Sequence, residues 1–307
     1  MDYSRLVRDA WALTWRHKFL WVLGFFAGGG TGSCAGNGLS QGWPSRDDMA
    51  TPGRRQSRDD VTWGDFTDWL GDNIELVLVL AAIAGGLLLV LSLIHFVAAG
   101  GLIRAISELV QDRPVTLGQA WSTGTRFFWR FLGLALLQLP LWLVLFGMGA
   151  AMFLAFGVRG AALGGLLLLV VSVPLTIVVV FAQCAIAIRD EGTIEAIGSA
   201  VALLRAQLGP SLLIWLLEMA VTIAASVGLA IGMLIAAIPI VVVAVVLYFV
   251  STVALVLFLV SIGVAALAGT LVLVGIAGTW MWGYWVLAYL GLNERPGPAT
   301  VAPAPHV

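Results

Sequence analysis

Seven apolar stretches alternate with polar connections along the chain, and this alternation predicts the structural class. A helix crosses the hydrocarbon core of a bilayer with about 20 apolar residues, and most of the stretches reach that length. Residues 209–292 carry a single charged side chain, that of Glu218. We therefore predict an all-α protein, a polytopic transmembrane helical bundle with six or seven spans. The apolar stretches are 18–33, 74–99, 130–156, 161–188, 210–236, 239–260 and 262–291.

Three short amphipathic helices are predicted beside these spans, and they form a worn internal repeat. In 3–16 and 117–128, apolar residues recur at helical spacing with polar residues between them. Both copies contain Ala-Trp-x4-Arg, and Thr116 and Gln119 have capping-box spacing before the second copy. A third copy follows Thr193; it keeps the arginine but has lost the tryptophan. The residues that mark these membrane-surface helices are Trp11, Trp15, Arg16, Trp121, Arg126 and Arg205.

Each amphipathic helix is interpreted as lying in the plane of the membrane surface. Its aromatic side chains would sit in the headgroup layer, with its arginines toward lipid phosphate and water. The plainer alternative is a short connector that is amphipathic only because one of its faces rests on other parts of the protein. Both interpretations place the three juxtamembrane helices directly before spans.

The repeat also predicts the topology. If the three copies lie on one side, the chain crosses the membrane twice between successive copies, which requires 18–33 to span. The side richer in cations is cytoplasmic by the positive-inside rule, so the N-terminus is predicted to be cytoplasmic. The repeat side holds Arg5, Arg8, Arg16, Lys18, Arg104, Arg113, Arg126, Arg130, Arg189 and Arg205, and the other side Arg46, Arg54, Arg55, Arg58 and Arg159.

The stretch 18–33 is the weakest candidate for a span. Its apolar centre, 19–27, is short, and such runs are often re-entrant or belong to signal peptides. A secretory signal is therefore the alternative, with Arg16, His17 and Lys18 as its basic region. The internal repeat argues against removal of this segment, because the topology needs it.

The number of spans after residue 210 is open. Two helices of about 40 residues would each be roughly 60 Å long, twice the thickness of the hydrocarbon core. Three shorter helices fit the core better, with breaks at Pro239 and at 261–263. Three crossings, however, would place the C-terminus outside.

One integral membrane domain, 1–292, is expected to take up nearly the whole chain. Residues 34–73 are expected to form an extracytoplasmic mobile loop, and 293–307 a disordered C-terminal tail. The predicted topology puts Cys34 and Cys184 at different levels of the membrane, so no disulfide is expected between them.

Four polar side chains within spans form the candidate intramembrane site. His95, Gln138, Gln183 and Glu218 lie about 9–14 Å below the cytoplasmic anchors, at a helical rise of 1.5 Å per residue. We infer a polar layer centred on Glu218, whose carboxylate is expected to be protonated or paired with His95 or a glutamine. An ionisable residue in a span is a functional hypothesis by default. The alternative is interhelical hydrogen bonding, which is favoured for the two glutamines.

Composition supports a membrane protein and points away from several other classes. Hydrophobic residues make up 60% of the chain and charged residues 11%, against about 25% charged in soluble domains. A net charge of −1 gives no reason to expect nucleic-acid binding. Neither a metal-binding histidine spacing, nor a phosphate loop, nor a hydrolase motif is present in the sequence. We therefore expect no enzyme activity, no cofactor and no metal.

Two aromatic motifs resemble a known family. They are Phe-Phe-Trp-Arg-Phe-Leu-Gly at 127–133 and Tyr-Trp-Val-Leu-Ala-Tyr-Leu at 284–290. With the order of amphipathic helix and span over most of 1–291, they resemble bacterial polytopic membrane proteins similar to the membrane domain attached to some glycerophosphodiester phosphodiesterases. The phosphodiesterase module itself has no counterpart in this sequence, so the resemblance implies no enzymatic activity. It implies six spans with the C-terminus inside.

The expected function is that of a non-enzymatic protein of the bacterial cytoplasmic (inner) membrane. It would organise lipids or assist other membrane proteins through its amphipathic helices. Its expected partners are membrane lipids, with other membrane proteins or a second copy of the chain as further candidates, and no nucleic acid. The alternative is a small transporter or permease, with Glu218 and His95 as a protonatable site. An intramembrane enzyme ranks third.

Overall fold

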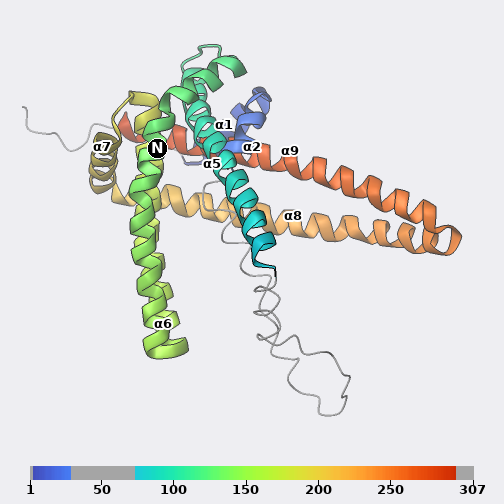
Figure 1. Ribbon diagram of the computed structural model, residues 1–307. Helices are drawn as coiled ribbons and strands as arrows, with labels where there is room; N and C mark the ends of the chain where they lie inside the picture. The colour runs from blue at the N-terminus through green and yellow to red at the C-terminus, as the bar shows by residue number, and fades with distance from the viewer. Residues whose placement is uncertain (1–2, 29–72, 295–307) are drawn as a thin grey trace, which may run out of the picture. The chain divides into compact units, whose positions relative to one another are not determined.

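The computed structural model describes residues 3–28 and 73–294. Within these ranges every regular element is an α-helix (Figure 1), which confirms the predicted all-α class. Most of the predicted loop 34–73 and of the tail 293–307 lies outside the described residues, as does Cys34. The helices are α1 (Tyr3–Arg16), α2 (Leu20–Gly28), α5 (Ile74–Val110), α6 (Leu117–Arg189), α7 (Thr193–Ala206), α8 (Leu208–Val250) and α9 (Thr252–Asn293).

The chain divides into two compact units. One consists of Met1–Gly28 and Phe96–Val307, and the other of Gly29–His95. The described part of the second unit is the first half of α5, whose apolar side chains are exposed around most of the helix. A helix that is apolar all round suits the interior of a membrane. The contacts described below all lie within the first unit, and the expected single membrane domain stays a prediction.

Four helices are long and apolar enough to cross a membrane, namely α5, α6, α8 and α9. Helix α2, with nine residues, is too short to cross a bilayer as it stands. The structure thus agrees with a helical membrane protein, while the predicted six or seven spans stay a prediction.

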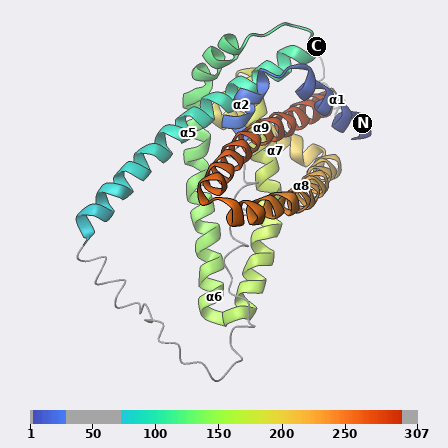
Figure 2. The same ribbon diagram turned by 90° about the vertical axis from the view of Figure 1, so that its right-hand side faces the viewer.

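Helix α6 is a helical hairpin rather than a single rod. Its two arms are joined at Gly157, where the backbone leaves the helical region at φ 60° and ψ −140° (Figure 2). Glycine adopts a positive φ without steric cost. Beyond the turn, a Cβ on Gly160 would lie 1.9 Å from the carbonyl oxygen of Met152, so only glycine fits there. The predicted division between 130–156 and 161–188 is therefore confirmed.

The chain from residue 208 forms two long helices instead of the three spans favoured from the sequence. The only break falls at Ser251, whose backbone is extended and whose hydroxyl accepts a hydrogen bond from the N–H of Ala254 at 3.4 Å. Serine is among the best N-cap residues, which explains why a helix begins here. Figure 1 shows α8 and α9 running out together to this shared turn.

The breaks predicted at Pro239 and at 261–263 are wrong. Pro239 lies inside α8, and 261–263 lies inside α9. Proline is tolerated within apolar helices because local adjustments satisfy the freed backbone groups. Ser261 does not cap a helix, because its hydroxyl donates to the carbonyl oxygen of Phe258 within α9 at 2.8 Å.

The packed core of the first unit draws on all of its helices, and α1 and α2 join it at the C-terminal part of α9. Thr279 donates its hydroxyl to the carbonyl oxygen of Leu20 at 3.0 Å, and the indole of Trp282 donates to that of Ala27 at 3.3 Å. Gly24 and Gly278 let the two backbones approach, because a Cβ on Gly278 would lie 2.1 Å from the Gly24 carbonyl oxygen.

Candidate functional site

Five ion pairs gather at one end of the first unit, on the ends of α5, α6 and the connection to α7. We call these residues the charged end. They form two clusters and a further pair beside them. In each cluster, one carboxylate lies between two guanidinium groups. The pairs are Arg104–Glu108, Arg113–Glu108, Arg126–Asp190, Arg130–Asp190 and Arg189–Glu191.

The first cluster is built by the way α5 ends. Asp112 adopts the left-handed conformation at φ 57°, the Arg113 N–H bonds to the Glu108 carbonyl oxygen and the Asp112 N–H to that of Leu109. This is the hydrogen-bond pattern of a Schellman motif, and it turns Arg113 back over the last turn of the helix. The Glu108 carboxylate therefore lies between Arg104, at 2.6 Å, and Arg113, at 3.1 Å.

The second cluster ties together the two arm ends of α6. Arg126 and Arg130 lie one turn apart on the first arm, and Asp190 caps the second arm in the left-handed conformation at φ 60°. Its carboxylate accepts hydrogen bonds from Arg126, at 2.5 Å, and from Arg130, which also donates to the Asp190 carbonyl oxygen at 2.9 Å. One acidic residue thus fixes both ends of the hairpin.

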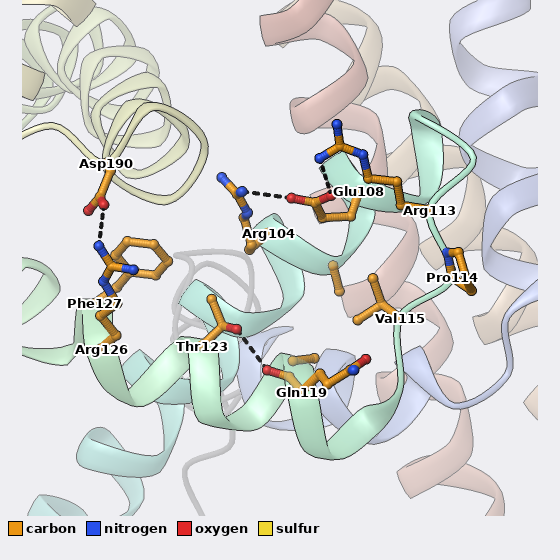
Figure 3. A pocket seen from close by; sticks show the side chains of 12 residues that line it. Arg104, Glu108, Arg113, Pro114, Val115, Gln119, Thr123, Arg126, Phe127 and Asp190 are labelled. Carbon is orange, nitrogen blue, oxygen red and sulfur yellow. Dashed lines mark hydrogen bonds and ion pairs between the residues drawn. The ribbon is translucent and has the colours of Figure 1, made fainter.

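The two clusters enclose a cavity of about 450 Å³. Arg104 links them, because it pairs with Glu108 and also donates to the carbonyl oxygen of Ile188 at 3.0 Å. Figure 3 shows Arg104, Arg113 and Arg126 around this cavity, with Phe127 and Val115 among the apolar side chains that line it. Four guanidinium groups face two carboxylates in the clusters, which leaves an excess of two positive charges.

The end of α9 also lies at the charged end. Arg189 donates to the side-chain oxygen of Asn293 at 2.8 Å and stacks over the ring of Tyr289, 5.9 Å from its centroid. Gln207, before α8, donates to the carbonyl oxygen of Leu292 at 3.0 Å. The C-terminal end of α9 is therefore held next to the α6–α7 connection, and not at the opposite end of the helices.

The first predicted surface helix is present as α1, but its two faces differ from the prediction. Leu6, Ala10 and Thr14 are buried against the core, and the Thr14 hydroxyl donates a hydrogen bond to the Ala10 carbonyl oxygen at 2.8 Å. Trp11 and Trp15 remain 51% and 44% exposed. The two tryptophans thus lie beside the buried face, which is formed by Leu6, Ala10 and Thr14.

The charge at the end of α1 comes from its permanent cations. Arg16 and Lys18 are exposed. Burial and the nearby charge of Arg16 lower the pKa of His17, so this histidine adds little charge at neutral pH.

The second predicted surface helix is the beginning of α6. Its capping box is confirmed: the Gln119 N–H bonds to the Thr116 hydroxyl at 3.4 Å, and the Thr116 N–H to the Gln119 side chain at 2.9 Å. Trp121 is partly exposed and Arg126 is exposed, as in the first copy. The helix continues without a break into the first arm, so this copy is not a separate in-plane helix.

The third predicted surface helix is α7, and the side of it that is buried differs from that of the other two copies. Its buried residues are Ala196, Ala200 and Leu204. Ala200 stands where the first two copies have tryptophan, and it is 1% exposed. Ile194, predicted on the apolar face, is 81% exposed, and Arg205 is exposed. Loss of the tryptophan thus goes with burial of that position.

The candidate intramembrane residues are not joined into one network in the described part of the chain. Glu218 is partly buried on α8, beside the side chain of Trp285. No hydrogen bond joins it to Gln138 or Gln183 among the described residues. Gln138 lies partly buried on the first arm of α6, and Gln183 lies on the second arm with its side-chain oxygen buried and unbonded. His95 belongs to the other unit and is partly buried on α5.

The aromatic surroundings of Glu218 were not anticipated. Tyr284 donates its hydroxyl to the Ile214 carbonyl oxygen, one turn before Glu218 on α8, at 2.7 Å. Trp280 stacks on Tyr284 with ring centroids 5.7 Å apart. The closing motif 284–290 was noted from its aromatic residues, but nothing in it indicated that Trp285 lies beside Glu218.

The helices and the charged end define the class: an all-α protein with four helices long and apolar enough to cross a membrane. Within that class, the chain belongs to a family whose description is "Family of unknown function (DUF7544)", and the family model matches residues 11–295. No curated protein and no solved structure matches the chain. Nothing in these comparisons links it to the membrane domain of glycerophosphodiester phosphodiesterases, so that resemblance stays a prediction.

Proposed function

We propose that the chain is a non-enzymatic integral protein of the bacterial inner membrane that organises anionic lipids at its charged end. The carrying observation is the excess of guanidinium groups in the two clusters, on helices whose other surfaces are largely apolar and exposed. Cationic groups at the ends of spans attract the anionic leaflet by about 1 kcal/mol each. The exposed tryptophans of α1 suit the headgroup layer beside them.

The distribution of cations supports a cytoplasmic charged end. Arg126, Arg130 and Arg189 lie at that end of α6, and Arg159 follows the turn at its other end. The richer side of a membrane protein is cytoplasmic by the positive-inside rule. The N-terminal helix belongs to the same side, because Leu6 and Leu290 line one small cavity between α1 and the end of α9.

Six crossings agree with this arrangement better than seven. Five of them are by α5, the two arms of α6, α8 and α9. The sixth is the crossing that the sequence predicts for 18–33, of which α2 is a part. An even number returns the chain to its starting side, and Asn293 is held at the charged end by Arg189. Two helices of about 60 Å accommodate a core of about 30 Å by tilting or by thickening the bilayer.

The lipid-organising function is tested by the lipids that leave the membrane with the protein. The wild-type chain and Arg8→Gln/Arg16→Gln are extracted into polymer-bounded native nanodiscs, and lipid mass spectrometry compares each disc with the bulk membrane. We expect anionic lipid to be enriched around the wild type and the enrichment to fall by about half in the variant, because two exposed cations of α1 are gone. Arg159→Gln is the matched control at the other end of α6 and should leave the enrichment unchanged. Discs of the wild type with bulk composition would refute the function.

A transporter remains the second candidate because of one observation: Glu218, an ionisable residue, lies within an apolar helix. Carbodiimide labelling in native membranes, mapped by peptide mass spectrometry across pH, tests it. Labelling of Glu218 that declines as pH rises would reveal an accessible protonated carboxyl and favour transport. Glu218→Gln should then abolish transport without altering lipid enrichment. An inert Glu218 beside normally labelled loop acids would leave the lipid function alone.

A further inference from the structure

The cavity at the charged end has the features of a built anion site. Its walls come from the end of α5, the α5–α6 connection, the first turns of α6 and the cap of the second α6 arm. Figure 3 shows that Arg104, Arg113 and Arg126 surround it from different segments. At about 450 Å³, it is large enough for a small polar headgroup. The arginines are therefore brought together by the fold and not by one helix face.

The guanidinium groups around the cavity are incompletely neutralised. Glu108 is shared by Arg104 and Arg113, and Asp190 by Arg126 and Arg130. Each cluster therefore keeps one net positive charge. Arg104, Arg113 and Arg126 line the cavity itself, whereas Arg130 pairs with Asp190 outside the lining. An anion with one or two negative charges would balance them.

Two of the arginines also keep hydrogen-bond donors available. A guanidinium carries five N–H donors, and within the described chain Arg113 and Arg126 each use one bond to a carboxylate. Their side chains are 66% and 68% exposed. The carboxylates hold them in place, and their remaining N–H groups have the planar fork geometry that matches two phosphate oxygens.

The rest of the lining favours an anion that carries an organic group. Phe127 is almost fully buried, and it contributes to the wall with Val115, Pro114 and Ala120. Gln119 and Thr123 add polar groups on the first turns of α6. Such a wall suits the glycerol carbons next to a phosphodiester better than it suits a fully hydrated inorganic ion.

We propose that this cavity binds the phosphate of an anionic lipid headgroup through Arg113 and Arg126, with Arg104 linking the two clusters behind them. The proposal rests on the proposed function and deepens it, because it names one site and the chemical group that the site takes. The shared chemistry is a phosphate ester, whose source is a lipid or a small soluble molecule. The position of the cavity at the ends of α5 and α6 favours the lipid, since headgroups lie at the ends of spans.

The test compares the wild type with arginine variants, each purified into nanodiscs of phosphatidylcholine that contain 20% phosphatidylglycerol, about one lipid in five. Binding is followed through a spin-labelled phosphatidylglycerol that reports immobilised lipid. We expect the affinity for the labelled lipid to fall by at least about tenfold in Arg113→Gln/Arg126→Gln, because both charge-assisted hydrogen-bond donors are lost. Arg159→Gln is the control and should bind as the wild type does. Arg113→Lys/Arg126→Lys keeps the charge but loses the fork, so its affinity should be intermediate.

A second arm distinguishes the source of the phosphate. Glycerol 3-phosphate and inorganic phosphate are titrated against detergent-purified protein, and their binding is measured calorimetrically. Weak binding of both, with tight binding of phosphatidylglycerol, supports the lipid. Tight binding of glycerol 3-phosphate that is lost in Arg113→Gln/Arg126→Gln, with unchanged lipid immobilisation, overturns the lipid as the occupant.

The outcomes also separate this site from the proposed function. Unchanged lipid binding and unchanged phosphate binding in both double variants would overturn the site, provided that their thermal unfolding midpoints show them to be folded. Lipid enrichment in native nanodiscs that depends on Arg8 and Arg16 would then still support the general function. A wild type with no anionic lipid enrichment and no immobilised phosphatidylglycerol would overturn both.

Discussion

Single glycines set how closely the helices of the first unit approach one another. A Cβ on Gly278 would lie 2.1 Å from the carbonyl oxygen of Gly24, and one on Gly124 would lie 2.0 Å from that of Val97. Gly263, in contrast, has no neighbouring atom of this kind within 4 Å in the described chain. Close approach of this kind is how small residues promote packing between membrane helices. The same residue type is thus essential at one position of α9 and dispensable at another.

Replacement of Gly278 with alanine should destabilise the protein, because the added methyl group forces α2 and α9 apart. Overpacking of this kind costs about 1–3 kcal/mol, which would appear as a lower thermal unfolding midpoint in detergent. Gly263→Ala is the matched control on the same helix and should be neutral or slightly stabilising, since alanine has the higher helix propensity. Equal effects of the two substitutions would contradict the close approach of α2 and α9.

The ends of helices carry the chemistry of this protein at the scale of elements. Asp112 follows α5 and Asp190 follows α6, and both adopt the left-handed conformation. In each case the turn brings an arginine and a carboxylate together, either by folding the chain back or by joining two arms. Glycine is the usual residue at such positions, whereas aspartate is tolerated there at some cost in strain.

Asp112→Gly should stabilise the end of α5 by up to about 1 kcal/mol, because glycine adopts a positive φ without a Cβ penalty. The expected result is a higher thermal unfolding midpoint with unchanged lipid binding. Asp9→Gly is the control, since Asp9 lies inside α1 and glycine there should lower stability by about 0.5 kcal/mol. A fall in the midpoint for both variants would show that the Asp112 side chain does more than close the turn.

At the scale of the whole molecule, the ion pairs of the first unit gather at its charged end. Arg189 and Asn293 meet at the charged end, and α1 packs near the end of α9. The turn of α6 at Gly157 lies an arm away from that end. This arrangement favours one side of the membrane for α1, α7 and the C-terminal end of α9.

Cysteine labelling tests that arrangement in a chain with Cys34→Ala and Cys184→Ala. Ala12→Cys and Glu294→Cys should react with a membrane-impermeant maleimide only in inverted vesicles, because the proposed topology puts both positions on the cytoplasmic side. Val158→Cys, beside the α6 turn, should react in intact cells. All three chosen side chains are exposed. Reaction of Glu294→Cys from the outside would mean an odd number of crossings.

The sequence predicted the features that depend on local pattern. The apolar runs indicated the helices, the capping box at Thr116 was read correctly, and the α6 turn was expected between 156 and 161. The turn at Ser251 was not predicted, because the uncharged run 209–292 lacks a change in polarity at a helix end. Contacts between remote segments, such as that of Trp285 with Glu218, are also not encoded in any local spacing.

The charged end could be predicted from the sequence only in part, for the same reason. Its arginines were identified and assigned to one side of the membrane by counting cations. Glu108 and Asp190 were not singled out, although each lies next to a helix end. A left-handed aspartate after a helix is a recognisable signal, but its pairing with Arg126 across 64 residues follows only from the fold.

The uncharged hairpin of α8 and α9 also bears on how the protein is made. Positive charges near the ends of a segment set its orientation during insertion, and between Arg205 and Arg295 the chain has none. Neither arm of the hairpin therefore carries a positive charge of its own that would set its orientation during insertion. We expect Arg205 to set the orientation of the hairpin before the first arm is complete, and the second arm to follow its partner into the bilayer around Ser251.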